Sequence, residues 1–187
     1  MNKKNIEKLI SELIIELDED PNREGLKKTP QRVAQMLSEI TQGYKTTRQQ
    51  TIKDAIFKEN VHNMIILRDI ELYSLCEHHL IPFFGKCHVG YIPKKNIIGV
   101  SKIARIVDRF SKRLQVQERL THEIAQEIHD ALDPYGVGVV IEAQHLCMMM
   151  RGIEKQNSVM ITSAVLGAFR KDLKTREEFM TIVNKTK

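Results

Sequence analysis

Residues 75–85, LCEHHLIPFFG, place a thiol and two imidazoles within four positions. Cys76 and His79 have the close spacing of a metal-binding pair, which needs a further ligand from elsewhere in the chain. Cys147, in the segment HLCMMMRG, is the candidate. Two thiolates and one imidazole would suit Zn²⁺, and three protein ligands with one open position are typical of catalytic zinc. The pattern therefore predicts a catalytic metal site.

Two more histidines, His78 and His145, would lie near such a metal without binding it. We predict a strand over residues 145–151, in which alternate side chains share a face, so His145, Cys147 and Arg151 would line one side of a sheet. Imidazoles exchange protons near neutral pH, and catalytic zinc lowers the pKa of its bound water to about 7. These residues together predict a hydrolase, without indicating its substrate.

The cysteines and histidines also have simpler interpretations. Cys76 and Cys147 could form a disulfide, but three cysteines are too few and too odd in number for a secreted disulfide framework. His79 and His145, each taken alone, fit ordinary half-buried residues. Their joint spacing favours the metal. Cys87 stands between apolar residues, and we predict that it only packs.

The composition, 42% hydrophobic and 28% charged, is typical of a folded globular protein. No apolar run approaches the roughly 20 residues that span a bilayer, and the N-terminus lacks the features of a signal peptide. We therefore expect a cytoplasmic protein with no membrane association. The net charge of +5 attracts anions, but with 5% aromatic residues the chain offers few stacking platforms for single-stranded nucleic acid.

A row of basic residues follows one face of a predicted helix, with spacings of i, i+3, i+7 and i+10: Lys102, Arg105, Arg109 and Lys112. The first two lie in the first turn, where backbone N–H groups and the helix dipole favour an anion. Arg151 would add a guanidinium suited to phosphate. The row fits either an anion-binding face or a solvated basic surface, and the pattern alone does not decide.

Glu118, in the segment LQVQERLT, is followed by Arg119 and lies among basic residues. It fits a surface ion pair, which contributes about 0–1 kcal/mol. It also fits a recognition carboxylate, because guanine presents N1–H and a 2-amino group side by side. Both interpretations stay open at this level.

The apolar patterns predict helices first and mainly strands later. The predicted helices cover residues 6–17, 30–43 with Thr29 as N-cap, 101–112 with Ser101 as N-cap, about 116–132, 164–169, and a last one that begins at a capping box of Thr175 and Glu178. The predicted strands cover residues 64–75, 85–92, 97–100, 137–143, 145–151 and 158–164. Residues 44–62 are predicted to be a connection. This order indicates one α+β domain over residues 46–187, preceded by a helical section over residues 1–45.

Several long segments resemble the GTP cyclohydrolase I family: SLCEHHLIPFFGKCHVGYIP, IGVSKIARIVDRFSKRLQVQERLT and VVIEAQHLCMMMRGI, with further likeness in DPNREGLKKTPQRVAQML and ITSAVLGAF. The resemblance begins at about residue 18 and covers most of the chain. It implies the tunnelling fold (T-fold), an α+β unit whose antiparallel sheets join around a ring. It also implies conversion of GTP and water to 7,8-dihydroneopterin triphosphate and formate, by a homodecamer with active sites at subunit interfaces.

Position by position, the resemblance assigns roles to the residues singled out above. Cys76, His79 and Cys147 become zinc ligands. His145 protonates N7 of guanine, and His78 protonates the ribose ring oxygen. A further set binds substrate, with Glu118 as the guanine anchor and the others along the ribose and triphosphate: Ser101, Lys102, Arg105 and Arg151. Ser101 would also assist the sugar rearrangement.

Two features depart from the family pattern. Cys87 stands where an aliphatic residue is usual, and the segment EKQNSVM differs from the usual Pro-Gly-Ser form. Two other functions remain as alternatives. One is a structural-zinc protein that binds nucleic acid through its basic helix, and the other is an enzyme that stops after opening the imidazole ring. The short N-terminus is more like a bacterial form serving folate synthesis.

Overall fold

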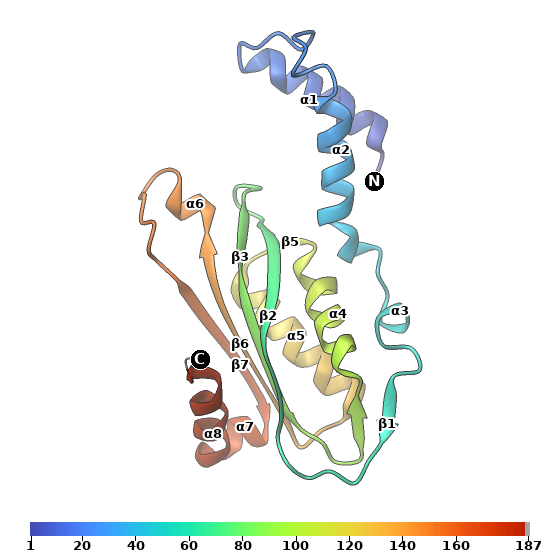
Figure 1. The fold of residues 1–187 in the computed structure, drawn as a ribbon, viewed down its shortest axis with the longest axis vertical. Helices are drawn as coiled ribbons and strands as arrows, with labels where there is room; N and C mark the ends of the chain where they lie inside the picture. The colour runs from blue at the N-terminus through green and yellow to red at the C-terminus, as the bar shows by residue number, and fades with distance from the viewer. Residues whose placement is uncertain (186–187) are drawn as a thin grey trace. The chain divides into compact units, whose positions relative to one another are not determined.

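The structure, a computed structural model, describes residues 1–185. By its internal contacts the chain separates into two compact units, Met1–Gln42 and a second unit that begins at Gly43 (Figure 1). None of the helices in this described part combines the length and apolar character that crossing a bilayer requires.

The first unit contains two helices, α1 (Lys3–Glu16) and α2 (Thr29–Ile40). The side chain of Asn2 caps α1 by accepting a hydrogen bond from the backbone N–H of Asn5. The prediction of Thr29 as the N-cap of the second helix was wrong, because Thr29 is already helical and its hydroxyl donates to the carbonyl of Gly25. Pro30 lies in the first turn, where its missing N–H costs nothing.

The second unit is built on a five-stranded sheet with the order β5-β2-β3-β6-β7. The long strands pair antiparallel: β2 (Ile65–Cys76), β3 (Pro82–Ile92), β6 (Gly136–His145) and β7 (Met160–Gly167). The short β5 (Leu114–Gln115) pairs parallel with the end of β2, so the sheet is mixed. A second, small sheet joins β1 (Ile56–Lys58) and β4 (Asn96–Ile98). The α+β class predicted from the sequence is confirmed.

Two helices, α4 (Val100–Ser111) and α5 (Gln117–Leu132), cover one face of this sheet. Their apolar stripes pack with alternate residues of β6 into the main core, as the predicted spacing requires. Side chains at the centre are fully buried: Ile103, Ile106, Leu120, Ile124, Ile128, Val139 and Ile141.

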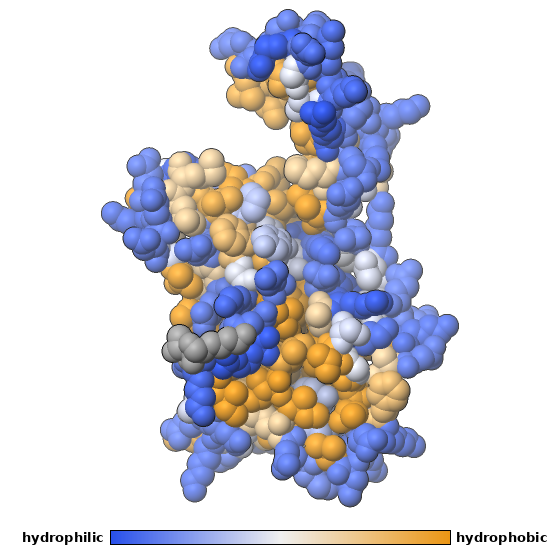
Figure 2. All heavy atoms as spheres, in the orientation of Figure 1, coloured by the Kyte–Doolittle hydropathy of each residue, from blue (hydrophilic) through white to orange (hydrophobic). Residues whose placement is uncertain are grey.

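The opposite face is covered in part by α7 (Ala168–Lys171) and α8 (Leu173–Asn184). Phe169 and Phe179 pack edge to face, with ring centroids 5.4 Å apart. A Cβ at Gly138 would lie 2.7 Å from the Phe169 ring, so only glycine lets that ring approach the strand. Figure 2 shows apolar side chains at the surface beside these helices, among charged residues.

Several predicted boundaries were wrong. Ser101 is not an N-cap, because α4 begins at Val100 and its capping residue is Gly99. The last helix is capped by Asp172, whose carboxylate accepts from the N–H of Thr175. The predicted helix over residues 164–169 is strand as far as Gly167, because β6 provides pairing partners along that length.

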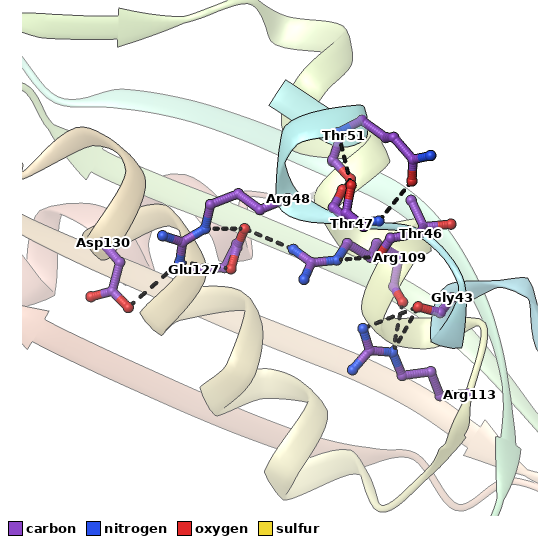
Figure 3. A network of polar contacts seen from close by, with 10 residues as sticks. Gly43, Thr46, Thr47, Arg48, Thr51, Arg109, Arg113, Glu127 and Asp130 are labelled. Atoms are coloured by element: carbon purple, nitrogen blue, oxygen red, sulfur yellow. Dashed lines mark hydrogen bonds and ion pairs between the residues drawn. The ribbon is translucent and has the colours of Figure 1, made fainter. Parts of the chain in front are cut away.

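The polar stretch predicted as a connection contains the short helix α3 (Arg48–Ile52), whose capping box pairs Thr47 with Gln50. A 3₁₀ turn, η1 (Gln42–Tyr44), precedes it. Figure 3 shows how arginines hold this segment: Arg109 donates to the carbonyl of Thr46 at 3.0 Å, and Arg113 donates to that of Gly43 at 3.1 Å. These hydrogen bonds from α4 and the residues that follow it order a stretch with few apolar residues of its own.

Candidate active site

The turn between β2 and β3 carries the first cluster of functional residues. Cys76 is the last residue of β2 and is buried, whereas the turn residues 77–80 are exposed. The N–H of Leu80 donates to the carbonyl of Cys76 at 2.9 Å, and Leu80 itself adopts a left-handed conformation with φ 55°. This tight turn presents His78 and His79 at the surface directly beside the Cys76 sulfur.

Cys147 follows the end of β6, where His145 pairs with Phe83 near the start of β3, so it lies at the same end of the sheet as the turn between β2 and β3. The strand predicted over residues 145–151 was wrong, because β6 ends at His145 and a short helix, α6 (Leu146–Met149), follows. The N–H of Met150 closes this helical turn on the carbonyl of Leu146 at 3.0 Å. The predicted common face of His145, Cys147 and Arg151 therefore does not exist as a strand face. Cys147 nevertheless lies next to Cys76.

The ligand atoms of Cys76, His79 and Cys147 all lie within 4.8 Å of one another. The Cys76 Sγ and His79 Nδ1 atoms are 3.9 Å apart. Tetrahedral coordination with Zn–S of about 2.3 Å and Zn–N of about 2.0–2.1 Å separates such atoms by roughly 3.6–3.8 Å. The group therefore fits zinc with small inward movements of its side chains.

The surroundings of the two sulfurs disfavour a free thiolate at Cys147. Burial raises the pKa of the Cys147 thiol, and the neighbouring Cys76 sulfur raises it further. A metal ion between the two sulfurs would offset both effects, because it stabilises the thiolates. Cys87, by contrast, is fully buried in the main core, in agreement with its interpretation as a packing residue.

His145 is the last residue of β6, and its side chain is half-buried. Its ring stacks on Phe83 with a centroid distance of 4.5 Å and an interplanar angle of 4°. Its Nε2 atom is 2.9 Å from Oε1 of Gln117. Burial lowers the pKa of His145, and the carboxylate of Glu118 opposes this shift. His78 differs, since it is exposed and its Nδ1 atom lies 3.8 Å from the Cys76 sulfur.

Glu118 lies exposed in the first turn of α5, and its neighbour Arg119 is paired with Glu77. The surface ion pair at this position is therefore formed by Arg119 with Glu77, and not by Glu118. Gln117, whose side chain contacts His145, is a candidate site residue that the sequence interpretation missed. Its signal was a polar residue on the apolar stripe of the helix, in line with Leu120 and Ile124.

The predicted basic row divides into two parts. Arg109 is paired with Glu127 at 2.8 Å and Lys112 with Asp108 at 3.2 Å, so these two do not form a free anion-binding face. The remaining predicted substrate residues make no side-chain hydrogen bond or ion pair within residues 1–185: Ser101, Lys102, Arg105 and Arg151. Those on α4 lie in its first turns, where the helix N-terminus adds positive potential.

A mixed sheet covered by two helices, with a thiol–imidazole group beside a hydrogen-bonded histidine, defines an α+β protein with a candidate metal-dependent active site. A family model described as GTP cyclohydrolase I matches residues 6–184.

Relatives named GTP cyclohydrolase 1 cover nearly the whole chain. The Leptospira biflexa protein is 60% identical over 178 residues, which are 95% of this chain and 97% of the relative. The Coxiella burnetii protein is 57% identical over 176 residues, 94% of this chain and 96% of the relative. That of Methylococcus capsulatus is 54% identical over 180 residues, with shares of 96% and 97%.

The chain belongs to the GTP cyclohydrolase I family, and the resemblance predicted from its sequence segments is confirmed. Members of this family are enzymes that take GTP as substrate, and the α+β fold described above is consistent with their T-fold.

Proposed function

We propose that this protein is a zinc-dependent GTP cyclohydrolase I that converts GTP and water to 7,8-dihydroneopterin triphosphate and formate. The observation that carries the proposal is the convergence of Cys76, His79 and Cys147, whose ligand atoms lie within 4.8 Å of one another in a chain of this family. These residues would hold one zinc ion per subunit. A zinc ion that keeps one coordination position open for water lowers the pKa of that water to about 7 and so supplies a hydroxide nucleophile at neutral pH.

Two histidines move protons in this proposal. His145 is half-buried and held by Gln117, which suits a general acid that protonates N7 as the imidazole ring of guanine opens. His78 is exposed on the turn beside Cys76, and there it would protonate the ribose ring oxygen. Ser101 would assist the sugar rearrangement that follows.

The charged side chains that would bind substrate make no side-chain hydrogen bond or ion pair among residues 1–185. Glu118 would accept hydrogen bonds from N1–H and the 2-amino group of guanine. Lys102, Arg105 and Arg151 would hold the ribose and triphosphate. The triphosphate undergoes no chemistry, so its binding energy serves to position the reacting atoms.

We further propose how the chain divides into domains, how its subunits assemble and where in the cell it acts. We place the catalytic T-fold domain at residues 46–187 and an accessory helical section at residues 1–45. Among residues 1–185, β7 pairs only with β6, so the sheet ends in an edge that a neighbouring subunit can extend. This edge supports a homodecamer with active sites between subunits, and the reduced cysteines support a cytoplasmic location.

The test is to incubate the purified protein with GTP, with and without a chelator, and to assay formate together with the fluorescent pterin formed on oxidation. Chelator-sensitive formation of both products is the expected result. Formate without pterin would show that the ring is opened but the sugar is not rearranged. Neither product from metal-loaded protein, with salt-dependent binding of nucleic acid, would overturn the proposal.

A further inference from the structure

The side-chain amide of Gln117 is buried at the start of α5 and has a fixed orientation. Its Nε2 atom lies 3.0 Å from the carbonyl oxygen of Ile141 and 2.9 Å from that of Met160. A third acceptor, the hydroxyl of Thr162, is 3.1 Å away. Carbonyl oxygens only accept hydrogen bonds, so the NH₂ group must face them. The amide oxygen must then face the other way.

That oxygen faces His145. The distance from Gln117 Oε1 to His145 Nε2 is 2.9 Å, and an amide oxygen cannot donate. The proton of this hydrogen bond therefore belongs to Nε2 of His145. A neutral imidazole carries one N–H, so Nδ1 is then the unprotonated nitrogen. Within residues 1–185, Nδ1 of His145 has no hydrogen-bond partner.

The surrounding contacts prevent either side chain from rotating. The Thr121 hydroxyl donates its hydrogen to the backbone carbonyl of Gln117 at 2.6 Å, and its oxygen lies 2.7 Å from the Thr162 hydroxyl. Thr162 can therefore donate to Thr121 while it accepts from Gln117, which closes the network with every group paired. On the other side, the ring of Phe83 lies parallel to that of His145. Gln117 itself is 1% exposed, so water does not compete for these hydrogen bonds.

We propose that Gln117 is a positioning residue that keeps a proton on Nε2 of His145, so that Nδ1 is the atom that takes up a second proton, giving the imidazolium, and then passes it to N7 of the substrate. The role of Nδ1 rests on the proposed function of His145, whereas the tautomer does not. Gln117 directly precedes Glu118, the proposed guanine anchor, in one helical turn. One helical turn would therefore carry both the residue that anchors guanine and the residue that orients the ring of His145.

The tautomer can be read by NMR of the protein labelled with ¹⁵N-histidine, with its metal retained, at a pH where His145 is neutral. His145→Gln identifies the signal. We expect wild-type His145 to carry its proton on Nε2 alone. Protonation on Nδ1, or a mixture of tautomers, would overturn the inference whether or not the enzyme produces pterin. Failure of the proposed function would appear instead as an absence of formate and pterin.

Two variants test the positioning role. Gln117→Met keeps the length of the side chain but removes its hydrogen bonds, and we expect a mixed tautomer and a kcat lower by about 100-fold, with KM for GTP changed by less than about threefold. Thr162→Val is the matched control, because it removes one acceptor of the same amide and leaves both carbonyls in place. It should keep the Nε2–H signal and a kcat within about threefold of wild type. A Gln117→Met enzyme that loses the tautomer yet keeps its kcat would overturn the positioning role.

Discussion

The carboxylate of Glu77 is paired with the guanidinium of Arg119. Glu77 lies between the proposed zinc ligands Cys76 and His79, and Arg119 follows the proposed guanine anchor Glu118. Arg119 also donates from Nε to Oε1 of Gln115 at 3.0 Å. This ion pair therefore joins the metal-binding turn to the helix that would hold the base.

Arg119→Met should lower kcat/KM for GTP by about tenfold, because supporting contacts of this kind typically alter activity by 10- to 100-fold. The thermal midpoint should change little, since the Arg119 and Glu77 side chains are 44% and 34% exposed. The control is Arg23→Met, which breaks an exposed ion pair to Glu19 in the first unit. An equal loss of activity in both variants would argue against a coupling role for Glu77 and Arg119.

Cys147→Ala should lose both bound metal and activity, because it removes one of three proposed ligands. His145→Ala should keep the metal and lose activity, because His145 is outside the ligand group. Metal content by elemental analysis and pterin formation separate the two roles. Stoichiometric zinc in an inactive Cys147→Ala protein would show that the ligand set is wrong.

Glu118→Gln should raise KM for GTP by about 10- to 100-fold, because hydrogen bonds to a charged group contribute about 1.5–3 kcal/mol. In glutamine an NH₂ donor replaces one carboxylate oxygen, so the side chain no longer offers one acceptor oxygen to each of the two guanine groups. Inosine triphosphate, which lacks the 2-amino group, serves as the probe of this contact. The preference of wild type for GTP over inosine triphosphate should shrink in the variant, and an unchanged preference would exclude Glu118 as the anchor.

Glu127→Gln should destabilise the second unit by about 3 kcal/mol, because it leaves the half-buried guanidinium of Arg109 without its counter-ion. Glu127 accepts from Arg109 at 2.8 Å and from Arg48 at 2.9 Å, and its side chain is 7% exposed (Figure 3). Urea unfolding measures the effect. Asp54→Asn, which alters an exposed pair with Lys53, should leave the urea midpoint unchanged. Equal midpoints for all three proteins would show that the network contributes nothing.

Stability should fall as the pH drops below about 6.5, in part through His88. Burial lowers the pKa of His88, and its Nδ1 atom accepts from the N–H of Asp69 at 3.2 Å. The unfolded chain therefore takes up this proton at a higher pH than the folded one, and protonation favours unfolding until the folded pKa is passed. His88→Asn keeps an acceptor near Nδ1 but does not titrate. Urea midpoints between about pH 7.5 and 5 should vary less in this variant, and parallel curves would contradict the assignment.

The candidate metal-ligand group could be predicted from the sequence because metal binding demands particular residue types. Two thiols and an imidazole are recognisable whatever backbone carries them. The backbone itself was not predictable at residues 146–149, because a short apolar run such as LCMM fits a strand as well as a helix. Cys147 reaches the site along either path, so the ligand prediction did not depend on the wrong element.

Tertiary partners explain the remaining errors. Arg109 was placed in a basic row because its own helix exposes that spacing, and its partner Glu127 belongs to another helix. Gln117 donates hydrogen bonds to three different strand residues and accepts one from His145. Capping residues were wrong by one or more positions, since a hydroxyl near a helix start fits several capping arrangements.

The pairing of β3 with β6 places Phe83 directly opposite His145. Cys76 lies before this pair of strands and Cys147 directly after it, so the strands must align before the three ligands can meet. A slip of one residue would turn His145 to the other face of the sheet and away from Gln117. A metal that binds only the aligned form stabilises that form by mass action. Metal binding would then stabilise only those molecules whose strands pair in the correct register, and misaligned molecules would unfold more readily.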